Sequence, residues 1–231
     1  MAFAHNPVLA DDYWDLDSWI GSIFTPDFEK ITNIEDRKQA FFDYLLPEIE
    51  KQNSKIIRLR NDIKNNRLSA RNLDELFRYY RLDKKATVED LLTSIDVIPA
   101  SLVLSQAAYE SGWGRSRFAK YYHNFFGLWC FKKGCGVVPN QRRAGDKHEI
   151  KKFSSLEKGI EYYMHSINRN MAYATLRKIR KNKRDNQEVI SGIGLAEGLV
   201  NYAEIGYDYV ETVQQIITDN SLSRYDYYLE P

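Results

Sequence analysis

The sequence predicts a mainly helical fold of the α+β class, in which helices surround one short β element. Apolar residues recur at helical spacing along most of the 231-residue chain. Helix-capping patterns precede three of these segments, at residues 32–35, 87–90 and 154–157. The alternation typical of strands is weak and confined to residues 137–139 and 148–153, which predicts a small β-hairpin.

The N-terminal third predicts an irregular arm followed by a helical extension that braces the rest. Residues 1–31 are aromatic and acidic with few helix cues, and we expect them to pack through Trp14, Trp19, Ile20 and Phe24. A long helix follows the first capping pattern, with a break or kink at Pro47, and a second helix covers residues 73–80. No catalytic constellation occurs here. We therefore predict a brace at residues 1–86 and a catalytic domain at residues 87–231.

A mostly apolar helix is predicted within residues 98–114, and an acid stands at its end. Pro99 suits the first helical turn, and Gly112 tolerates the left-handed conformation that ends helices. Glu110 therefore falls in the last turn, where the helix dipole and apolar surroundings both disfavour a carboxylate. Both effects raise the pKa of Glu110, as a general acid requires. The alternative interpretation is an ordinary surface glutamate at a frayed helix end.

An aromatic segment at residues 123–130 follows a short predicted helix at residues 115–122 and is interrupted by Gly127. This pattern predicts an edge strand or turn that lines a cleft. Cys130 and Cys135 follow at a spacing that suits a disulfide around a tight turn, and such a bond indicates an exported protein. Two reduced thiols are the alternative, because no second pair of cysteines completes a zinc site.

The remaining chain predicts more helices. One begins after the third capping pattern, another covers residues 195–202, and a last one restarts after a break at residues 203–206. The cations at residues 177–184 form the one basic block of the sequence. This block is interpreted either as a solvated helix end or as a contact for a polyanion.

Composition excludes several classes of protein. The net charge of +1 gives no global field for nucleic acid, and no apolar run is long enough to span a membrane. Residues 1–7 lack the basic and apolar regions of a signal peptide. The four histidines are not spaced as a metal cluster, and phosphate-loop, dinucleotide and serine-elbow motifs are missing. We expect no cofactor, no metal and no nucleic-acid partner. An isolated acid facing an aromatic loop suits glycoside hydrolysis.

Three stretches, in the right order, resemble a known family. Residues 106–116, Gln-Ala-Ala-Tyr-Glu-Ser-Gly-Trp-Gly-Arg-Ser, are similar to the catalytic-helix motif of the bacterial glucosaminidase domains, glycoside hydrolase family seventy-three. Residues 124–127, Asn-Phe-Phe-Gly, look like that family's Asn-Leu-Phe-Gly, and residues 202–207 take the place of its late tyrosine segment. The resemblance is strongest with the Bax-type branch of the family. It adds residues 37–45, the cysteine loop of residues 129–136 and residues 195–199.

The resemblance implies a lysozyme-like helical domain with a small β-lobe across a cleft. It implies cleavage of the β-1,4 bond after N-acetylglucosamine in the glycan strands of peptidoglycan, with Glu110 as the general acid. The matching positions for substrate contacts are Asn124, Phe126, Gly127, Trp129, Tyr202 and Tyr207. We expect a monomer that acts in the periplasm or is otherwise exported to the cell envelope.

The second carboxylate is where the sequence departs from the family pattern. The family often places a glutamate in a Thr-x-Glu stretch of the β-lobe, and no such triplet stands here. Glu149 is the nearest candidate, with Asp146 behind it. A carboxylate nucleophile, an activated water and the substrate's own acetamido group are three routes that stay open. The alternative functions are a lytic transglycosylase or muramidase, and a peptidoglycan-binding module without catalysis.

Overall fold

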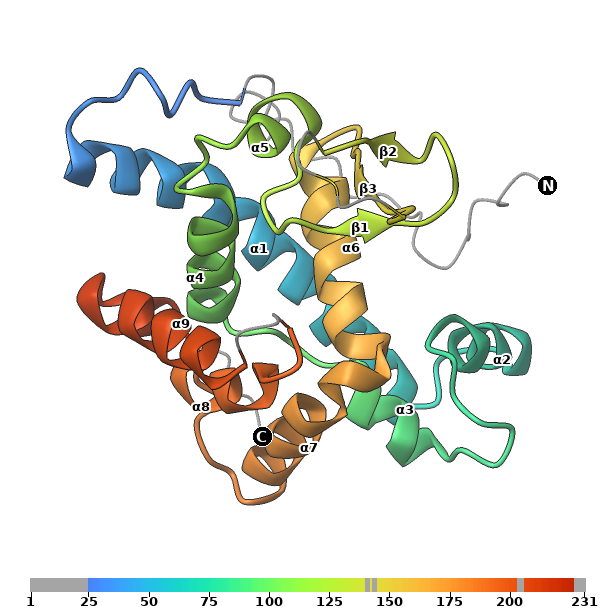
Figure 1. Cartoon of the computed structure of the whole chain (residues 1–231). Helices are drawn as coiled ribbons and strands as arrows, with labels where there is room; N and C mark the ends of the chain where they lie inside the picture. Colours follow the sequence, from blue (N-terminus) through green and yellow to red (C-terminus); the bar gives the residue numbers. More distant parts are fainter. Residues whose placement is uncertain (1–24, 140–141, 143–144, 203–205, 227–231) are drawn as a thin grey trace, which may run out of the picture.

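Figure 1 shows the fold as a computed structural model, which describes residues 25–139, 142, 145–202 and 206–226. The helices are α1 (Ile34–Lys64), α2 (Ala70–Tyr79), α3 (Val88–Ser94), α4 (Ala100–Ser111), α5 (Arg117–Tyr122), α6 (Leu156–Arg169), α7 (Ala174–Asp185), α8 (Gly192–Ala196) and α9 (Tyr207–Asp219). The strands are β1 (Trp129–Cys130), β2 (Gly136–Val137) and β3 (Glu149–Lys151). The predicted fold class, mainly helical with a small β-lobe, is confirmed. The anchors expected at Trp14, Trp19, Ile20 and Phe24 lie outside the described residues.

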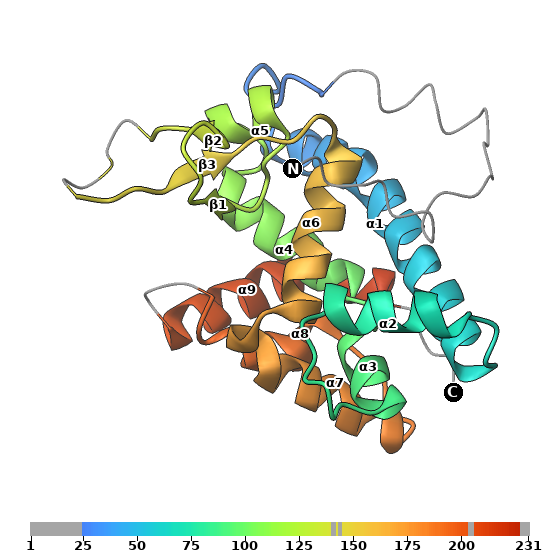
Figure 2. The ribbon, with the colours of Figure 1, turned by 90° about the vertical axis from the view of Figure 1, so that its right-hand side faces the viewer.

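Helix α4 is the centre of the fold. Every residue from Ala100 to Ala108 is buried, and the helix contacts α1, α8 and α9. A helix covered on all sides has to be apolar around its whole circumference, which explains the continuous apolar sequence. Gly112 ends the helix in the left-handed conformation, with φ of 57°. Figures 1 and 2 show α4 and α6 between the sheet at one end of the molecule and α7, α8 and α9 at the other.

Helix α1 is longer than expected. It runs from Ile34 to Lys64 with Pro47 inside it, so of the predicted break or kink at this proline the break is wrong and the kink stays a prediction. One face contributes Phe41, Leu45 and Ile49 to the same core as α4. This burial stabilises the helix by more than the roughly 3 kcal/mol that an internal proline costs, because each large buried side chain contributes about 2 kcal/mol.

Two of the three predicted capping patterns are displaced by one residue. The N-cap of α1 is Asn33, whose side chain accepts hydrogen bonds from the Glu35 and Asp36 amides. The N-cap of α6 is Ser155, which caps through the Lys158 amide. The capping box at Thr87 and Asp90 is present in full. Ser, Thr and Asn are all good caps, so neighbouring candidates compete and the sequence pattern alone does not choose between them.

The β-lobe is a three-stranded antiparallel sheet with β3 in the middle, so the predicted hairpin gains a third strand. Trp129 pairs with Ile150 on one side of β3, and Val137 pairs with Ile150 on the other. Cys130 and Cys135 form a disulfide between β1 and the start of β2, which confirms the predicted bond. In so small a sheet this cross-link restricts the connecting turn.

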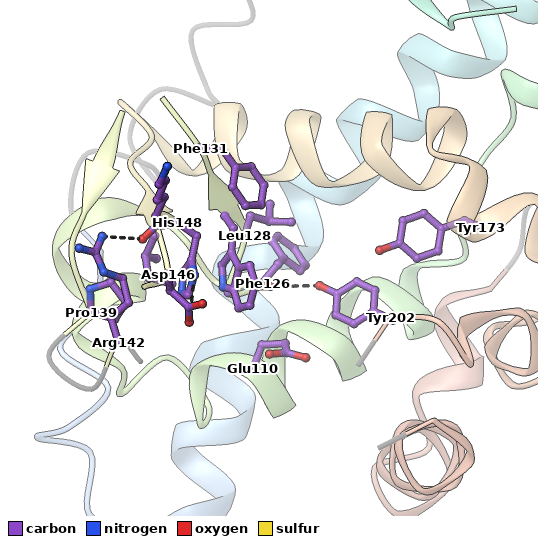
Figure 3. Close-up of a pocket in the computed structure, with 14 residues that line it drawn as sticks. Glu110, Phe126, Leu128, Phe131, Pro139, Arg142, Asp146, His148, Tyr173 and Tyr202 are labelled. Atoms are coloured by element: carbon purple, nitrogen blue, oxygen red, sulfur yellow. Dashed lines mark hydrogen bonds and ion pairs between the residues drawn. The ribbon is translucent and has the colours of Figure 1, made fainter. Parts of the chain in front are cut away.

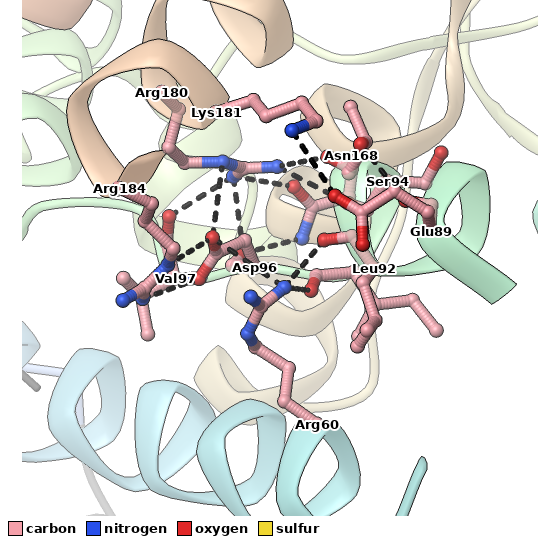
Figure 4. A network of polar contacts seen from close by, with 12 residues as sticks. Arg60, Glu89, Leu92, Ser94, Asp96, Val97, Asn168, Arg180, Lys181 and Arg184 are labelled. Atoms are coloured by element: carbon pink, nitrogen blue, oxygen red, sulfur yellow. Dashed lines mark hydrogen bonds and ion pairs between the residues drawn. The ribbon is translucent and has the colours of Figure 1, made fainter. Parts of the chain in front are cut away.

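The basic block of residues 177–184 lies in α7, and part of it is buried. Arg180 is fully buried and donates hydrogen bonds to the carbonyls of Thr93, Ser94, Asp96 and Val97. The carboxylate of Asp96 accepts two hydrogen bonds from Arg184 (Figure 4). These cations therefore fix the segment that leads into α4, a role that neither sequence interpretation included.

Candidate functional site

A cleft of about 840 Å³ separates the β-lobe from the helices (Figure 3). Its described lining comes from the end of α4, the loop before β1, the β-lobe and two tyrosines on the helical side. The residues are Glu110, Phe126, Gly127, Leu128, Trp129, Phe131, Pro139, Arg142, Asp146, Lys147, His148, Ile150, Tyr173 and Tyr202. The structure thus brings Glu110, Phe126, Gly127, Trp129 and Tyr202 together, as expected for a shared site.

Glu110 lies where the buried helix α4 reaches the cleft, and its side chain is partly buried. Burial raises the pKa of Glu110 above that of an exposed glutamate, and a hydrogen bond with Tyr209 opposes this rise. Among the residues that the structure describes, no basic side chain contributes to the change. Burial therefore extends to higher pH the range in which Glu110 keeps its proton, and the protonated form is the one from which a general acid acts.

The loop between α5 and β1 is held by Asn124. Its Nδ2 donates to the carbonyls of Leu128 and Lys151, and its Oδ1 accepts from the amides of Phe126 and Leu128. The side chain is 1% exposed and lies outside the lining of the cleft. All four hydrogen bonds that the Asn124 amide can make are thus made within the protein. Its role is therefore to hold the shape of the loop.

Two tyrosines clamp Phe126 from the helical side. The ring of Tyr163 stacks on the Phe126 ring, with ring centroids 3.9 Å apart. The Tyr202 hydroxyl donates to the Phe126 carbonyl over 3.0 Å (Figure 3). Gly127 follows with φ of 61°, a conformation that favours glycine. The contacts of Tyr163 and Tyr202 with Phe126, together with the turn at Gly127, therefore fix the path of this loop beside Glu110.

Aromatic and charged side chains form the β-lobe wall of the cleft. Trp129 is 49% exposed and stacks on His148, with ring centroids 3.9 Å apart. The Nδ1 atom of His148 lies 3.8 Å from the carboxylate of Asp146, and Arg142 donates to the His148 carbonyl (Figure 3). An indole exposed on one face suits stacking against a sugar ring. Glu110 and Asp146 are the two carboxylates in the described lining.

Glu149 lies in a different place from the one expected for a second catalytic carboxylate. It is buried in β3, outside the lining of the cleft, and its two oxygens accept hydrogen bonds from the amides of Gly134 and Gly136. These amides lower the pKa of Glu149. Cys130, Cys135 and Glu149 offer ligand atoms within 4.8 Å of one another. The cysteines are joined in a disulfide, however, and thiolates are what a metal needs.

The structure places the predicted Tyr207 away from the cleft and brings another tyrosine of α9 to Glu110. Tyr207 is 72% exposed and lies outside the cleft lining, whereas Tyr209 is fully buried and contacts Glu110. Helical spacing could have found this residue, because Tyr209 shares a face with the buried Val213 and Ile217. The same spacing places Gln106 four residues before Glu110, on the same side of α4.

A helical domain that holds a protonatable acid at the end of a buried helix, opposite a small sheet, has the architecture of a lysozyme-like glycoside hydrolase. Residues 85–222 match the family described as glucosaminidase, mannosyl-glycoprotein endo-beta-N-acetylglucosaminidase, and the chain belongs to this family. It is also similar to Protein bax of Escherichia coli (strain K12), with 28% identity over 207 residues, 84% of this chain and 74% of that protein. No solved structure shows significant similarity to the chain. Within the described residues, none of the helices combines the length and apolar character required to cross a bilayer.

Proposed function

We propose that this protein hydrolyses the β-1,4 glycosidic bond that follows N-acetylglucosamine in peptidoglycan. Membership of the glucosaminidase family supports the reaction class. The observation that carries the assignment of the acid is the position of Glu110, which lines the cleft and whose pKa is raised by burial. The disulfide supports an exported protein, as a cell-wall substrate requires.

In the proposed reaction, the Glu110 carboxyl group donates its proton to the oxygen that leaves the scissile bond. Trp129 and Phe126 supply aromatic surface for the sugar rings, and Tyr202 holds the loop that carries Phe126 and Gly127. Asn124 and Tyr207 are left out of the substrate contacts, because neither side chain lines the cleft.

We assign the role of the second carboxylate to Asp146 in place of Glu149. Asp146 lines the cleft on the side of the β-lobe. It lies next to His148, whose ring stacks on that of Trp129. Both oxygens of Glu149 are already bound to backbone amides. The configuration of the first-formed product reports the chemistry, because activation of water by Asp146 gives inversion, and a nucleophile or the acetamido route gives retention.

The test is digestion of purified peptidoglycan, followed by separation of the soluble products and mass spectrometry. We expect fragments with N-acetylglucosamine at the reducing end, and no turnover by Glu110→Gln, which keeps its binding to the insoluble glycan. Fragments ending in anhydro-muramic acid would identify a lytic transglycosylase instead. Binding without any product from the wild-type protein would identify a binding module.

A further inference from the structure

A chain of hydrogen bonds crosses the core from α6 to the cleft and ends on Glu110. The Tyr163 hydroxyl on α6 donates to Gln106 Oε1 on α4. Gln106 Nε2 then donates to the Tyr209 hydroxyl on α9 over 2.8 Å. Tyr209 shares a hydrogen bond with the Glu110 carboxyl group. Helices α6 and α9 contribute one group each to this path, and α4 contributes two, Gln106 and Glu110.

The chemistry of these groups gives the path a direction. An amide oxygen can only accept, so the Tyr163 hydroxyl is the donor at the first contact. The amide nitrogen can only donate, so the Tyr209 oxygen is the acceptor at the second. Because that nitrogen supplies a hydrogen to the Tyr209 oxygen, the Tyr209 hydroxyl hydrogen does not point at Gln106 and is available to the neighbouring Glu110. Donation to Glu110 agrees with the pKa of Glu110, which the contact with Tyr209 lowers.

Burial keeps this arrangement in place. Gln106, Tyr163 and Tyr209 are each 0% exposed, so that water cannot substitute for a lost partner. Tyr163 is also stacked on Phe126, and Tyr209 on Tyr202 with ring centroids 5.2 Å apart. The residues that direct the hydrogen bonds are thus packed against the residues that line the cleft.

We propose that Gln106 and Tyr209 are positioning residues, which hold a hydroxyl hydrogen against one carboxyl oxygen of Glu110 so that its transferable proton resides on the other. After transfer, the same hydroxyl stabilises the carboxylate that remains. This inference rests on the proposed role of Glu110 as the general acid. It goes beyond that role by naming the buried glutamine that decides which way the Tyr209 hydroxyl points.

Two opposing effects then set the acidity of Glu110. Burial favours the protonated form, whereas the hydrogen bond from Tyr209 favours the ionised form. When the Tyr209 hydroxyl is removed, or the Gln106 amide that directs it, nothing opposes the effect of burial on the Glu110 pKa. The titration midpoint of Glu110 should then move to higher pH, by about one pH unit for a full hydrogen bond to a carboxylate.

The experiment is a ¹³C NMR titration of glutamate-labelled protein without substrate, in which Glu110→Gln identifies the Glu110 Cδ signal. We expect the midpoint to rise in Tyr209→Phe and in Gln106→Leu. In the double variant it should rise no further than in Tyr209→Phe, because Gln106 acts through Tyr209. Gln215→Leu, the same substitution at an exposed position of α9, should leave the midpoint unchanged. Should Gln106→Leu fail to fold, Tyr163→Phe, which keeps the ring stacked on Phe126, should give a smaller rise in the same direction.

An unchanged Glu110 midpoint in a folded Tyr209→Phe variant would overturn the proposal. A midpoint that falls would also overturn it, because it would mean that Glu110 donates to Tyr209 and the amide points the other way. Additive shifts in the double variant would show that Gln106 acts independently of Tyr209. The titration does not depend on hydrolysis. Failure of the general-acid role would be recognised separately, as retained turnover by Glu110→Gln.

Discussion

The Oε2 atom of Glu110 lies 3.2 Å from the point that a β-carbon on Gly127 would occupy. That separation is tighter than a carbon atom normally allows, and Gly127 also has φ of 61°, which side chains disfavour. Glycine at this position thus serves two purposes at once. It permits the turn before β1, and it leaves the space in which the Glu110 carboxyl group faces the cleft.

Gly127→Ala should therefore impair hydrolysis more than it impairs folding. The added methyl group displaces the Glu110 carboxyl group, and misplacement of a reacting group costs roughly 10- to 100-fold in rate. The positive φ alone costs about 1–2 kcal/mol of unfolding free energy. Gly134→Ala is the matched control, because Gly134 has φ of 80° with nothing within 4 Å of its added β-carbon. Equal rates of hydrolysis in Gly127→Ala and Gly134→Ala would show that Gly127 does not set the position of the Glu110 carboxyl group.

Glu110→Gln should stabilise the protein in a manner that depends on pH. Burial raises the pKa of Glu110 in the folded state, so folding favours the protonated form. This contribution is fully present below the pKa of the unfolded chain and is lost as pH rises through the folded pKa. A neutral glutamine avoids that loss, and we expect a gain of about 1 kcal/mol near pH 8 that vanishes near pH 3.5.

Urea unfolding at the two pH values measures this difference. Glu211→Gln on the exposed side of α9 serves as the control and should show no gain at either pH. A Glu110→Gln variant no more stable than the wild type at pH 8 would contradict the raised pKa on which the general-acid role depends.

The sequence predicted the elements that build the site more completely than the contacts inside it. The helix that ends at Gly112, the turn at Gly127 and the Cys130 to Cys135 bond were all predicted from local patterns. Each depends on a property of one residue type or on a short spacing. The family is confirmed for the same reason, because its motifs are short and local.

The positions of other site residues depend on contacts that local patterns do not contain. Glu149 is the nearest candidate for the family's β-lobe glutamate, yet its oxygens are bound to the amides of Gly134 and Gly136. Tyr209 is not predicted, because only the packing of α9 against α4 decides which tyrosine reaches Glu110. The division at residues 86 and 87 stays a prediction. Helix α1, from before that boundary, shares one hydrophobic core with α4.

Glu149→Gln should loosen the β-lobe and retain more activity than Glu110→Gln. The amides of Gly134 and Gly136 lower the pKa of Glu149, so its stabilising contribution is present above the unfolded pKa and is lost as pH falls through the folded pKa. A neutral glutamine offers one accepting oxygen to these two amides. Hydrogen exchange should therefore show faster exchange at Gly134 or Gly136. A loss of activity as deep as in Glu110→Gln, without faster amide exchange, would show that Glu149 is a catalytic residue.

Asp96→Asn should destabilise the whole protein, because one carboxylate compensates several buried cations (Figure 4). Arg184 donates to both Asp96 oxygens, and Arg60 and Arg180 lie 3.4 and 3.9 Å from Oδ2. Burial alone raises the pKa of Asp96, but the hydrogen bond from Arg184 and the charges of Arg180 and Arg60 outweigh it, so the pKa is lowered. Uncompensated buried charges typically cost about 3–5 kcal/mol.

The effect of Asp96→Asn should depend on pH in the sense opposite to that of Glu110→Gln. Because the folded pKa of Asp96 is lowered, its contribution is present above the unfolded pKa and is lost as pH falls through the folded pKa. The unfolding free energies of the wild type and Asp96→Asn should therefore differ most near neutral pH and converge in acid. Asp185→Asn, in an exposed ion pair with Lys181 on the same helix, should change stability by less than about 1 kcal/mol. A similar loss in both variants would mean that Asp96 contributes no more than a surface charge, and that the segment before α4 is fixed by other contacts.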